Sequence, residues 1–296
     1  MGRRKGADMN TRKIVHHSES KPVMEGAGVK LRRAFGFHDT DRYDPFLLLD
    51  DFRGERPEDY TAGFPWHPHR GIETITYMLE GSVEHGDSLG NRGVIRSGDV
   101  QWMTAGGGIV HQEMPKPGEN GRMGGFQLWA NLPASRKMIA PRYQEYGRND
   151  FPVVDIGNGA QARVICGRME NVEGPVDAVA IAPGFFDIAL PPRREIFLPF
   201  AKEQNVIAYV FEGEGFFETD TETPFGNRTL IHFGEGDSIR VAATPGGVRF
   251  LLITGIPIRE PVAWGGPIVM NTRAELETAF RELDEGTFLQ SPAPKR

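Results

Sequence analysis

Hydrophobic residues occur along this chain in short runs rich in Val, Ile, Phe and Tyr, and Gly and Pro separate the runs. Runs bounded by turn residues in this way are typical of β-strands. Strands are therefore expected at residues 73–79, 94–96, 100–104, 125–130, 162–166, 185–190, 205–211, 238–241 and 248–254. The pattern predicts an all-β protein with only a few short helices.

Helical periodicity is clear only near the end of the chain. Thr272 and Glu275 have the spacing of a capping box, and Gly286 stands where a helix is expected to stop. Between them, apolar residues recur at intervals of four and three: Leu276, Phe280 and Leu283. We expect a helix at about residues 272–285 and a shorter helical turn near residues 135–138.

The two halves of the chain contain an internal repeat. Three ordered matches link them: ITYMLEG at 75–81 with IAYVFEG at 207–213, Gly98 with Gly236, and Phe126 with Phe250. A strand that ends in Glu-Gly and is followed by a Gly-Asp turn into another strand is expected from two hairpin-rich barrels of one plan. We predict a tandem duplication with an N-terminal domain at 1–134, a linker at 135–151 and a C-terminal domain at 152–296.

The repeat fails at one segment. The second and third matches are 28 positions apart in the first half but 14 apart in the second half. The additional segment of the first half holds His111 and Glu113, and the repeat partners of His67 and His69 are not histidines. Any site built from these four residues therefore belongs to the first domain alone.

Composition and charge exclude several classes of protein. Hydrophobic residues make up 39% and charged residues 25%, as in ordinary globular proteins. A net charge of -6 and a pI near 5.8 do not favour nucleic-acid binding. Cys166 is the single cysteine, so a disulfide within the chain is excluded, and it is expected to be buried and inert. No run suits a membrane span or a signal peptide, so a cytoplasmic location is expected.

His67, His69, His111 and Glu113 are the predicted metal ligands. Residues two apart on an extended segment point to the same face, so the imidazoles of His67 and His69 can reach one ion. His111 and Glu113 have the same spacing and supply a third imidazole and a carboxylate. No separate cofactor-binding residues are predicted.

The ligand types indicate which metals are suitable. Three imidazoles and one carboxylate suit iron, copper, nickel, manganese or zinc. A structural zinc site would usually close its tetrahedron, often with thiolates, and this chain has one cysteine. Four protein ligands in an octahedral site leave two positions for water, substrate or O2, which favours iron(II).

Two motifs carry a resemblance to a known family. HPHRGIETITYMLEG, from His67, and GDVQWMTAGGGIVHQEMP, from Gly98, resemble the signature of the pirin family, a bicupin branch of the cupin superfamily. The closing GPIVMNTRAELETAFRELDEGTF also resembles a pirin C-terminus. The resemblance implies two tandem cupin β-barrels, one metal, usually iron, in the first barrel, and ligands at the four positions already selected.

The general cupin pattern offers an alternative carboxylate. In many cupins the glutamate ligand follows the His-x-His motif, where Glu73 stands in this sequence. Glu113 is preferred because it shares a face with His111 and because pirins place their carboxylate there. His85 offers a further imidazole that could orient a ligand, but a surface turn is the favoured interpretation of that residue.

Two kinds of function follow from the resemblance. Bacterial pirins suggest a quercetin 2,3-dioxygenase, an oxidoreductase that opens a flavonol ring with O2 and releases carbon monoxide, with Glu113 as general base. Trp66, Met103 and Phe126 are the candidate pocket walls. The alternative is a non-enzymatic, iron-binding regulatory protein that acts through protein partners, as animal pirins do. Direct nucleic-acid or membrane binding is not expected.

Overall fold

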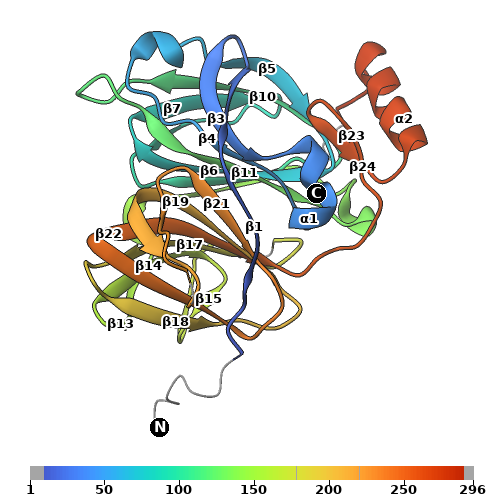
Figure 1. The fold of residues 1–296 in the computed structure, drawn as a ribbon. Coiled ribbons are helices and arrows are strands. Elements are labelled where there is room, and N and C mark those ends of the chain that lie inside the picture. The colour runs from blue at the N-terminus through green and yellow to red at the C-terminus, as the bar shows by residue number, and fades with distance from the viewer. Residues whose placement is uncertain (1–9, 178, 220, 290–296) are drawn as a thin grey trace. The chain divides into compact units, whose positions relative to one another are not determined.

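The computed structural model describes residues 10–177, 179–219 and 221–289. The chain forms two compact units that each combine distant segments. The first unit consists of Lys21–Asp150 and Ile258–Arg296, and the second unit consists of Met1–Ser20 and Phe151–Pro257. Strands dominate both units, which confirms the predicted all-β class (Figure 1).

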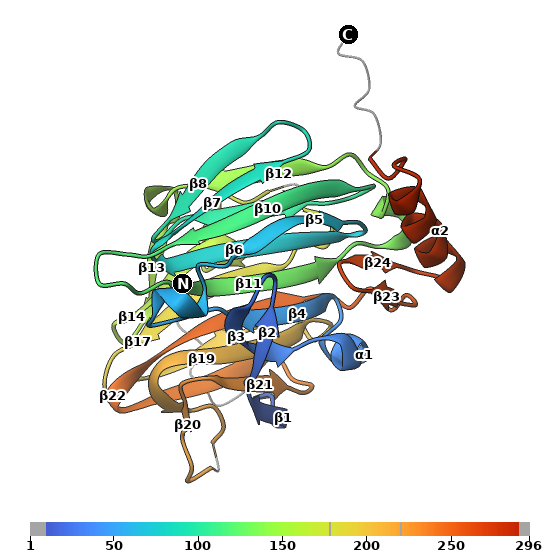
Figure 2. The same cartoon turned by 90° about the horizontal axis from the view of Figure 1, so that it is seen from above.

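Two antiparallel sheets and a short ribbon form the described part of the first unit. The larger sheet has the order β12-β9-β6-β11-β4-β3-β2, and the smaller has the order β5-β10-β7-β8 (Figure 2). Their bounds are β2 Lys21–Glu25, β3 Val29–Phe35, β4 Phe46–Asp51, β5 Phe64–His69, β6 Ile72–Glu80, β7 Ser82–Asp87, β8 Arg92–Arg96, β9 Val100–Thr104, β10 Ile109–Lys116, β11 Gly124–Asn131 and β12 Arg142–Tyr146. The ribbon pairs β23 Ala263–Gly265 with β24 Ile268–Met270.

One large sheet organises the described part of the second unit. Its main path is β1-β21-β19-β22-β17-β14-β13, with β18 paired to β22 and β20 paired to β19. The bounds are β1 Ile14–Glu19, β13 Val153–Gly157, β14 Ala160–Cys166, β17 Gly184–Leu190, β18 Glu195–Pro199, β19 Asn205–Phe216, β20 Phe225–Gly226, β21 Thr229–Phe233 and β22 Ser238–Gly255. A separate ribbon pairs β15 Arg168–Met169 with β16 Val172–Glu173.

Helices are short in the described residues. The α-helices are α1 Thr40–Tyr43 and α2 Arg273–Asp284, and 3-10 turns lie at Phe37–Asp39, Pro57–Asp59, Ala134–Arg136 and Arg148–Asp150. Thr272 and Glu275 form the predicted capping box of α2. The helix lies beside β23 and β24 (Figures 1 and 2), where Leu276 and Leu283 pack against a cluster that contains Ile268 and Ala279.

The repeat has a direct structural meaning. In the second unit, β22 begins directly after Gly236-Asp237 and runs through the Phe250 match as one strand of 18 residues. In the first unit, the corresponding stretches are β9 and β11, and β10 is inserted between them. Strand β10 is the segment that carries His111 and Glu113, so the insertion places a strand with two of the predicted ligands in one unit only.

The structure divides the chain differently from the predicted boundaries of 1–134, 135–151 and 152–296. Strand β1 pairs with β21 and therefore belongs to the second unit, whereas the segment from Ile258, with α2, belongs to the first. The predicted linker contains β12, which pairs with β9. The repeat aligns only the segments that both units share, so it gave no information about these exchanged ends.

Candidate metal centre

Three histidines lie together on two neighbouring strands. His67 and His69 are on β5 and His111 is on β10, where His111 is the direct cross-strand partner of His67. Directly paired residues in an antiparallel sheet point to the same face. The ligand atoms of the three imidazoles all lie within 4.8 Å of one another. The structure therefore brings together the three histidines that sequence spacing selected.

Hydrogen bonds fix the tautomers of His67 and His69. The Nδ1 of His67 lies 2.8 Å from the carbonyl oxygen of Pro65, and the Nδ1 of His69 lies 3.2 Å from that of Pro267. A carbonyl oxygen only accepts, so both Nδ1 atoms carry a proton, and in the neutral form of each ring the lone pair is on Nε2. This arrangement is common in histidine ligands of metals, where the second ring nitrogen donates to a carbonyl.

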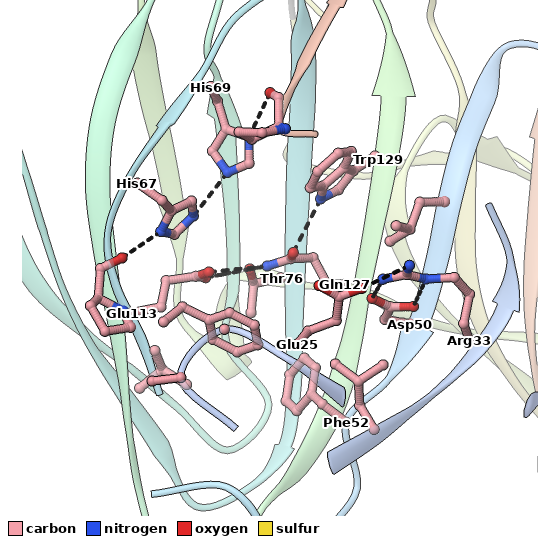
Figure 3. A pocket seen from close by; sticks show the side chains of 18 of the residues that line it. Glu25, Arg33, Asp50, Phe52, His67, His69, Thr76, Glu113, Gln127 and Trp129 are labelled. Atoms are coloured by element: carbon pink, nitrogen blue, oxygen red, sulfur yellow. Dashed lines mark hydrogen bonds and ion pairs between the residues drawn. The ribbon is translucent and has the colours of Figure 1, made fainter. Parts of the chain in front are cut away.

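The two Nε2 atoms lie 3.0 Å apart (Figure 3). Two lone pairs at this distance repel each other, whereas a cation bound by both makes the arrangement favourable. Two nitrogens that bind one ion at about 2.1 Å with a right angle between them are about 3 Å apart. The observed distance therefore fits a shared metal ion.

His111 completes the three-nitrogen set. Its side chain is 1% exposed, and neither ring nitrogen has a hydrogen-bond partner within the described residues. Its ring centroid lies 4.4 Å from that of His67 and 5.0 Å from that of His69. Burial lowers the pKa of His69 and of His111 well below the ordinary histidine value, and the neighbouring histidines add to this effect. Both imidazoles are therefore neutral, as metal binding requires.

Glu113 lies next to this cluster but outside the compact group of three. Its carboxylate accepts hydrogen bonds from Gln127 Nε2 at 3.2 and 3.4 Å and from Thr76 Oγ1 at 3.3 Å (Figure 3). The indole N–H of Trp129 donates to Gln127 Oε1 at 3.1 Å, which turns the amide NH2 group toward Glu113. Glu113 as the fourth ligand stays a prediction.

Gln127 and Thr76 are residues that the sequence reasoning missed. Both are polar residues in the middle of apolar strand runs, in β11 and β6. An uncharged polar side chain inside a buried strand needs a partner, and this was the signal that could have identified them.

Glu73 does not share the position of Glu113. It lies on β6, where residues 73 and 76 point to opposite faces because strand side chains alternate. Thr76 lines the cavity described below, whereas the carboxylate of Glu73 accepts a hydrogen bond from Thr104 at 2.8 Å. The geometry therefore favours Glu113 over Glu73.

His85 is buried on β7 rather than in a surface turn. It is the cross-strand partner of Glu113, and its Nε2 lies 2.8 Å from Glu145 Oε1. The sequence interpretation was wrong because the hairpin that holds His85 folds into the sheet of β10. Cys166 is a buried free thiol, as expected.

A cavity of about 580 Å³ opens next to the histidines. Aromatic side chains form much of its wall, and Glu113, Gln127 and Thr76 form its polar part (Figure 3). The aromatic lining residues are Phe37, Phe52, Phe64, Trp66, Trp129 and Trp264. Of the predicted walls, Trp66 lines the cavity, but Met103 and Phe126 are fully buried core residues.

An ion pair lines another part of the same cavity. Arg33 donates two hydrogen bonds of 2.8 Å to the carboxylate of Asp50, and a third ion-pair contact of 2.9 Å joins Arg33 to Glu25 (Figure 3). Strand pairing places Asp50 beside Gln127. The cavity thus combines an aromatic wall, a histidine cluster and a wall in which one guanidinium pairs with two carboxyl groups.

Residues 28–130 match the pirin family model, and residues 185–289 match the model of the pirin C-terminal cupin domain. The chain belongs to the pirin family. This membership confirms the resemblance seen in the sequence and the prediction of two cupin domains. Within residues 10–289, no described helix is long and apolar enough to cross a membrane.

Similar proteins cover nearly the whole chain of this pirin. A pirin-like protein of Caulobacter vibrioides is 43% identical over 95% of this chain and 100% of its own length. A Pseudomonas aeruginosa protein provisionally named a quercetin 2,3-dioxygenase is 40% identical over 94% of this chain and 98% of its own. A solved structure of quercetin 2,3-dioxygenase from Acinetobacter baumannii has a TM-score of 0.85 and 31% identity, and covers 94% of this chain and 98% of its own.

Proposed function

We propose that this pirin is a metal-dependent quercetin 2,3-dioxygenase. The observation that carries the proposal is a cluster of three converging imidazoles at the side of an aromatic-lined cavity. Similar proteins that are named quercetin 2,3-dioxygenases support it. The substrates would be a flavonol and O2.

His67, His69 and His111 would hold the metal, with Glu113 as the fourth ligand and iron(II) as the proposed ion. The bound ion would supply Lewis acidity at the flavonol oxygens and open positions for substrate and O2. Nitrogen and oxygen donors of this kind suit iron(II) and leave nickel, copper, manganese and zinc as competitors.

The chain's own residues would orient the flavonol and move one proton. Trp66, Trp129 and Trp264 offer flat apolar faces to the fused rings. Glu113 would accept the proton of the 3-hydroxyl group, because its carboxylate lies beside the histidines and can act as a general base. In the overall reaction both atoms of O2 enter the ring-opened product, and the hydroxyl-bearing ring carbon leaves with its oxygen as carbon monoxide.

The test is aerobic turnover with product analysis. Protein loaded with iron(II) under anaerobic conditions is mixed with quercetin, and O2 is then added. We expect loss of the flavonol absorbance and one carbon monoxide per quercetin consumed. His111→Ala, measured with the same iron concentration, should give neither signal.

Fully loaded protein that leaves quercetin unchanged would exclude the proposed activity. Loss of quercetin without carbon monoxide would also contradict it, because simple oxidation of the flavonol does not remove a ring carbon.

A further inference from the structure

Arg70 follows the proposed ligand His69 directly in the chain and is 2% exposed. An arginine stays protonated in proteins, so its buried N–H groups need acceptors nearby. Such a residue is costly to bury unless all parts of its guanidinium have partners. The acceptors of Arg70 come from two segments that are distant from it in the sequence.

Three hydrogen bonds and one ring contact hold the guanidinium. Its Nε donates to the carbonyl oxygen of Gly107 at 2.8 Å, and its Nη1 donates to Glu282 Oε2 at 2.6 Å. Its Nη2 donates to the carbonyl oxygen of Phe288 at 2.8 Å. The central carbon of the guanidinium also lies 4.2 Å from the centre of the Phe288 ring, a cation–π contact.

The Gly107 contact links Arg70 to the second ligand strand. Gly106, Gly107 and Gly108 form the loop that leads into β10, where His111 lies. A Cβ at Gly106 would lie 2.0 Å from the carbonyl oxygen of Ile139, and a Cβ at Gly108 would lie 2.9 Å from that of Phe288. Both glycines have positive φ, +51° and +138°. The loop is therefore packed too closely for side chains, against Ile139 at one glycine and Phe288 at the other.

The C-terminal segment also contacts the first ligand strand. His69 Nδ1 lies 3.2 Å from the Pro267 carbonyl oxygen, and the N–H of Val269 donates to the Arg70 carbonyl at 3.0 Å. The same segment continues into α2, which supplies Glu282, and then to Phe288. Residues 267–288 thus contact a histidine ligand, the residue after it and the loop before the third ligand.

We propose that Arg70 is a positioning residue for the metal centre, which fixes the two ligand strands relative to each other by anchoring both to Pro267–Phe288. The guanidinium is the shared point of the three segments, because it follows His69 in the chain and binds the Gly107 loop, α2 and Phe288. The inference rests on the proposed metal centre and not on the proposed dioxygenase reaction.

The test measures metal binding in the full-length chain. Cobalt(II) is the probe, since its visible absorption reports ligand geometry, and a chromophoric chelator competes for it. Arg70→Met, which keeps the length and removes the donors, should raise the Kd for cobalt(II) by about 10- to 100-fold, as loss of outer-shell partners does elsewhere. The cobalt absorption bands should shift as well.

Two further variants separate positioning from general stability. Arg70→Lys should restore part of the affinity, because an ammonium keeps the charge but cannot reproduce the planar fork of donors. Glu282→Met should also raise the Kd for cobalt(II). The double variant Arg70→Met with Glu282→Met should lose less binding free energy than the sum of the two single variants, as residues in one network do. Arg70→Lys also keeps the test available if Arg70→Met does not fold.

Arg12 provides a matched control in the second unit. It is also 2% exposed, and it donates to the carbonyl oxygens of Gln204 at 2.8 Å, Gly234 at 3.0 Å and Ala201 at 2.7 Å. Arg12→Met should lower the stability of the protein and leave cobalt(II) affinity unchanged.

The proposal is overturned if folded Arg70→Met or Arg70→Lys binds cobalt(II) with the wild-type Kd and spectrum. It is equally overturned if Arg12→Met weakens binding as much as Arg70→Met does. If the wild-type protein binds cobalt(II) but its iron form leaves quercetin intact, only the proposed dioxygenase activity is excluded. The proposal for Arg70 is unaffected by that result.

Discussion

At the scale of single residues, the carboxylate beside the histidines has competing demands. Glu113 accepts hydrogen bonds from Gln127 and Thr76, and it is also the proposed fourth ligand and base. A carboxylate with two oxygens and about four lone-pair sites can serve both kinds of partner. The neighbouring polar residues therefore set its orientation without consuming its capacity to bind.

Substitution distinguishes the two candidate carboxylates. We expect Glu113→Ala to reduce iron occupancy by about tenfold or more at limiting metal, since it removes a group beside the histidines. Glu73→Ala should keep occupancy and lower the free energy of unfolding by about 1–3 kcal/mol, because Thr104 loses its buried acceptor. Metal analysis of the purified variants together with denaturant unfolding checks both. Full occupancy in Glu113→Ala and loss in Glu73→Ala would reverse the assignment.

Substitution of Gln127 should lower kcat for quercetin more than substitution of Trp129 does. Gln127→Leu removes the amide donor from Glu113, and we expect kcat for quercetin to fall by roughly tenfold. Trp129→Phe keeps that donor but frees the amide to rotate, so a smaller decrease is expected. Steady-state kinetics at matched metal content measures both. A larger effect from Trp129→Phe than from Gln127→Leu would contradict this order.

The residue scale also shows what sequence reasoning could supply. Same-face spacing found His67, His69 and His111 because two-residue periodicity is local to each strand. Pro267 was beyond it, because this acceptor for His69 lies 198 positions away and no local pattern gives that contact. Arg70 was missed for the same reason, since a single arginine in a sequence does not show that it will be buried.

At the scale of elements, alternation and propensity predicted some strands well. Strand β9 has the predicted bounds, and α2 has the predicted cap. Strand β5 was not predicted because two prolines interrupt its apolar pattern, and β10 was not predicted because its buried face carries His111 and Glu113. The elements that carry the site are thus the ones whose composition departs most from an ordinary strand.

The short 3-10 turn at Ala134–Arg136 confirms the helical turn expected there and leads to a buried lysine. Lys137 is 2% exposed, and its Nζ donates to the carbonyl oxygen of Gly71 at 2.9 Å and to Asn131 Oδ1 at 2.7 Å. Burial lowers the pKa of Lys137 to about 7, although Glu260 and Glu275 partly oppose this effect.

Lys137 should make stability depend on pH above neutrality. In the unfolded chain a lysine keeps its proton until about pH 10.4, so between pH ~7 and ~10 the unfolded state binds more protons than the folded state. Stability therefore rises with pH in this window. We expect the free energy of unfolding of the wild type to increase by up to a few kcal/mol relative to Lys137→Met. Urea unfolding from pH 7 to 10 measures it.

Lys116→Met is the control for this pH dependence, because Lys116 has a side chain that is 52% exposed. The Lys116→Met variant should show the same pH dependence of the free energy of unfolding as the wild type. If Lys137→Met also keeps the wild-type slope, the buried ammonium does not titrate in this range.

At the scale of the whole molecule, the four tryptophans report on one unit. Trp66, Trp102, Trp129 and Trp264 all belong to the first unit, which also holds the proposed ligands. A ligand present at 100 times its Kd stabilises the folded state by about 2.7 kcal/mol. We therefore expect metal to raise the thermal midpoint observed by tryptophan fluorescence.

His67→Ala serves as the control for this measurement and should show no metal-dependent shift. An unchanged fluorescence midpoint in the metal-loaded wild type would contradict a metal site in the first unit.

The exchange of chain ends between the two units has a consequence for synthesis in the cell. After a ribosome has made β1, its partner β21 emerges only after more than 200 further residues. The ribosome completes β5 and β10 early, yet Pro267, Glu282 and Phe288 emerge more than 150 residues after β10. A nascent chain that stops near Pro257 would carry every proposed ligand and lack the acceptors for His69 and Arg70. Stable metal acquisition is thus expected only after residues 267–288 have emerged from the ribosome.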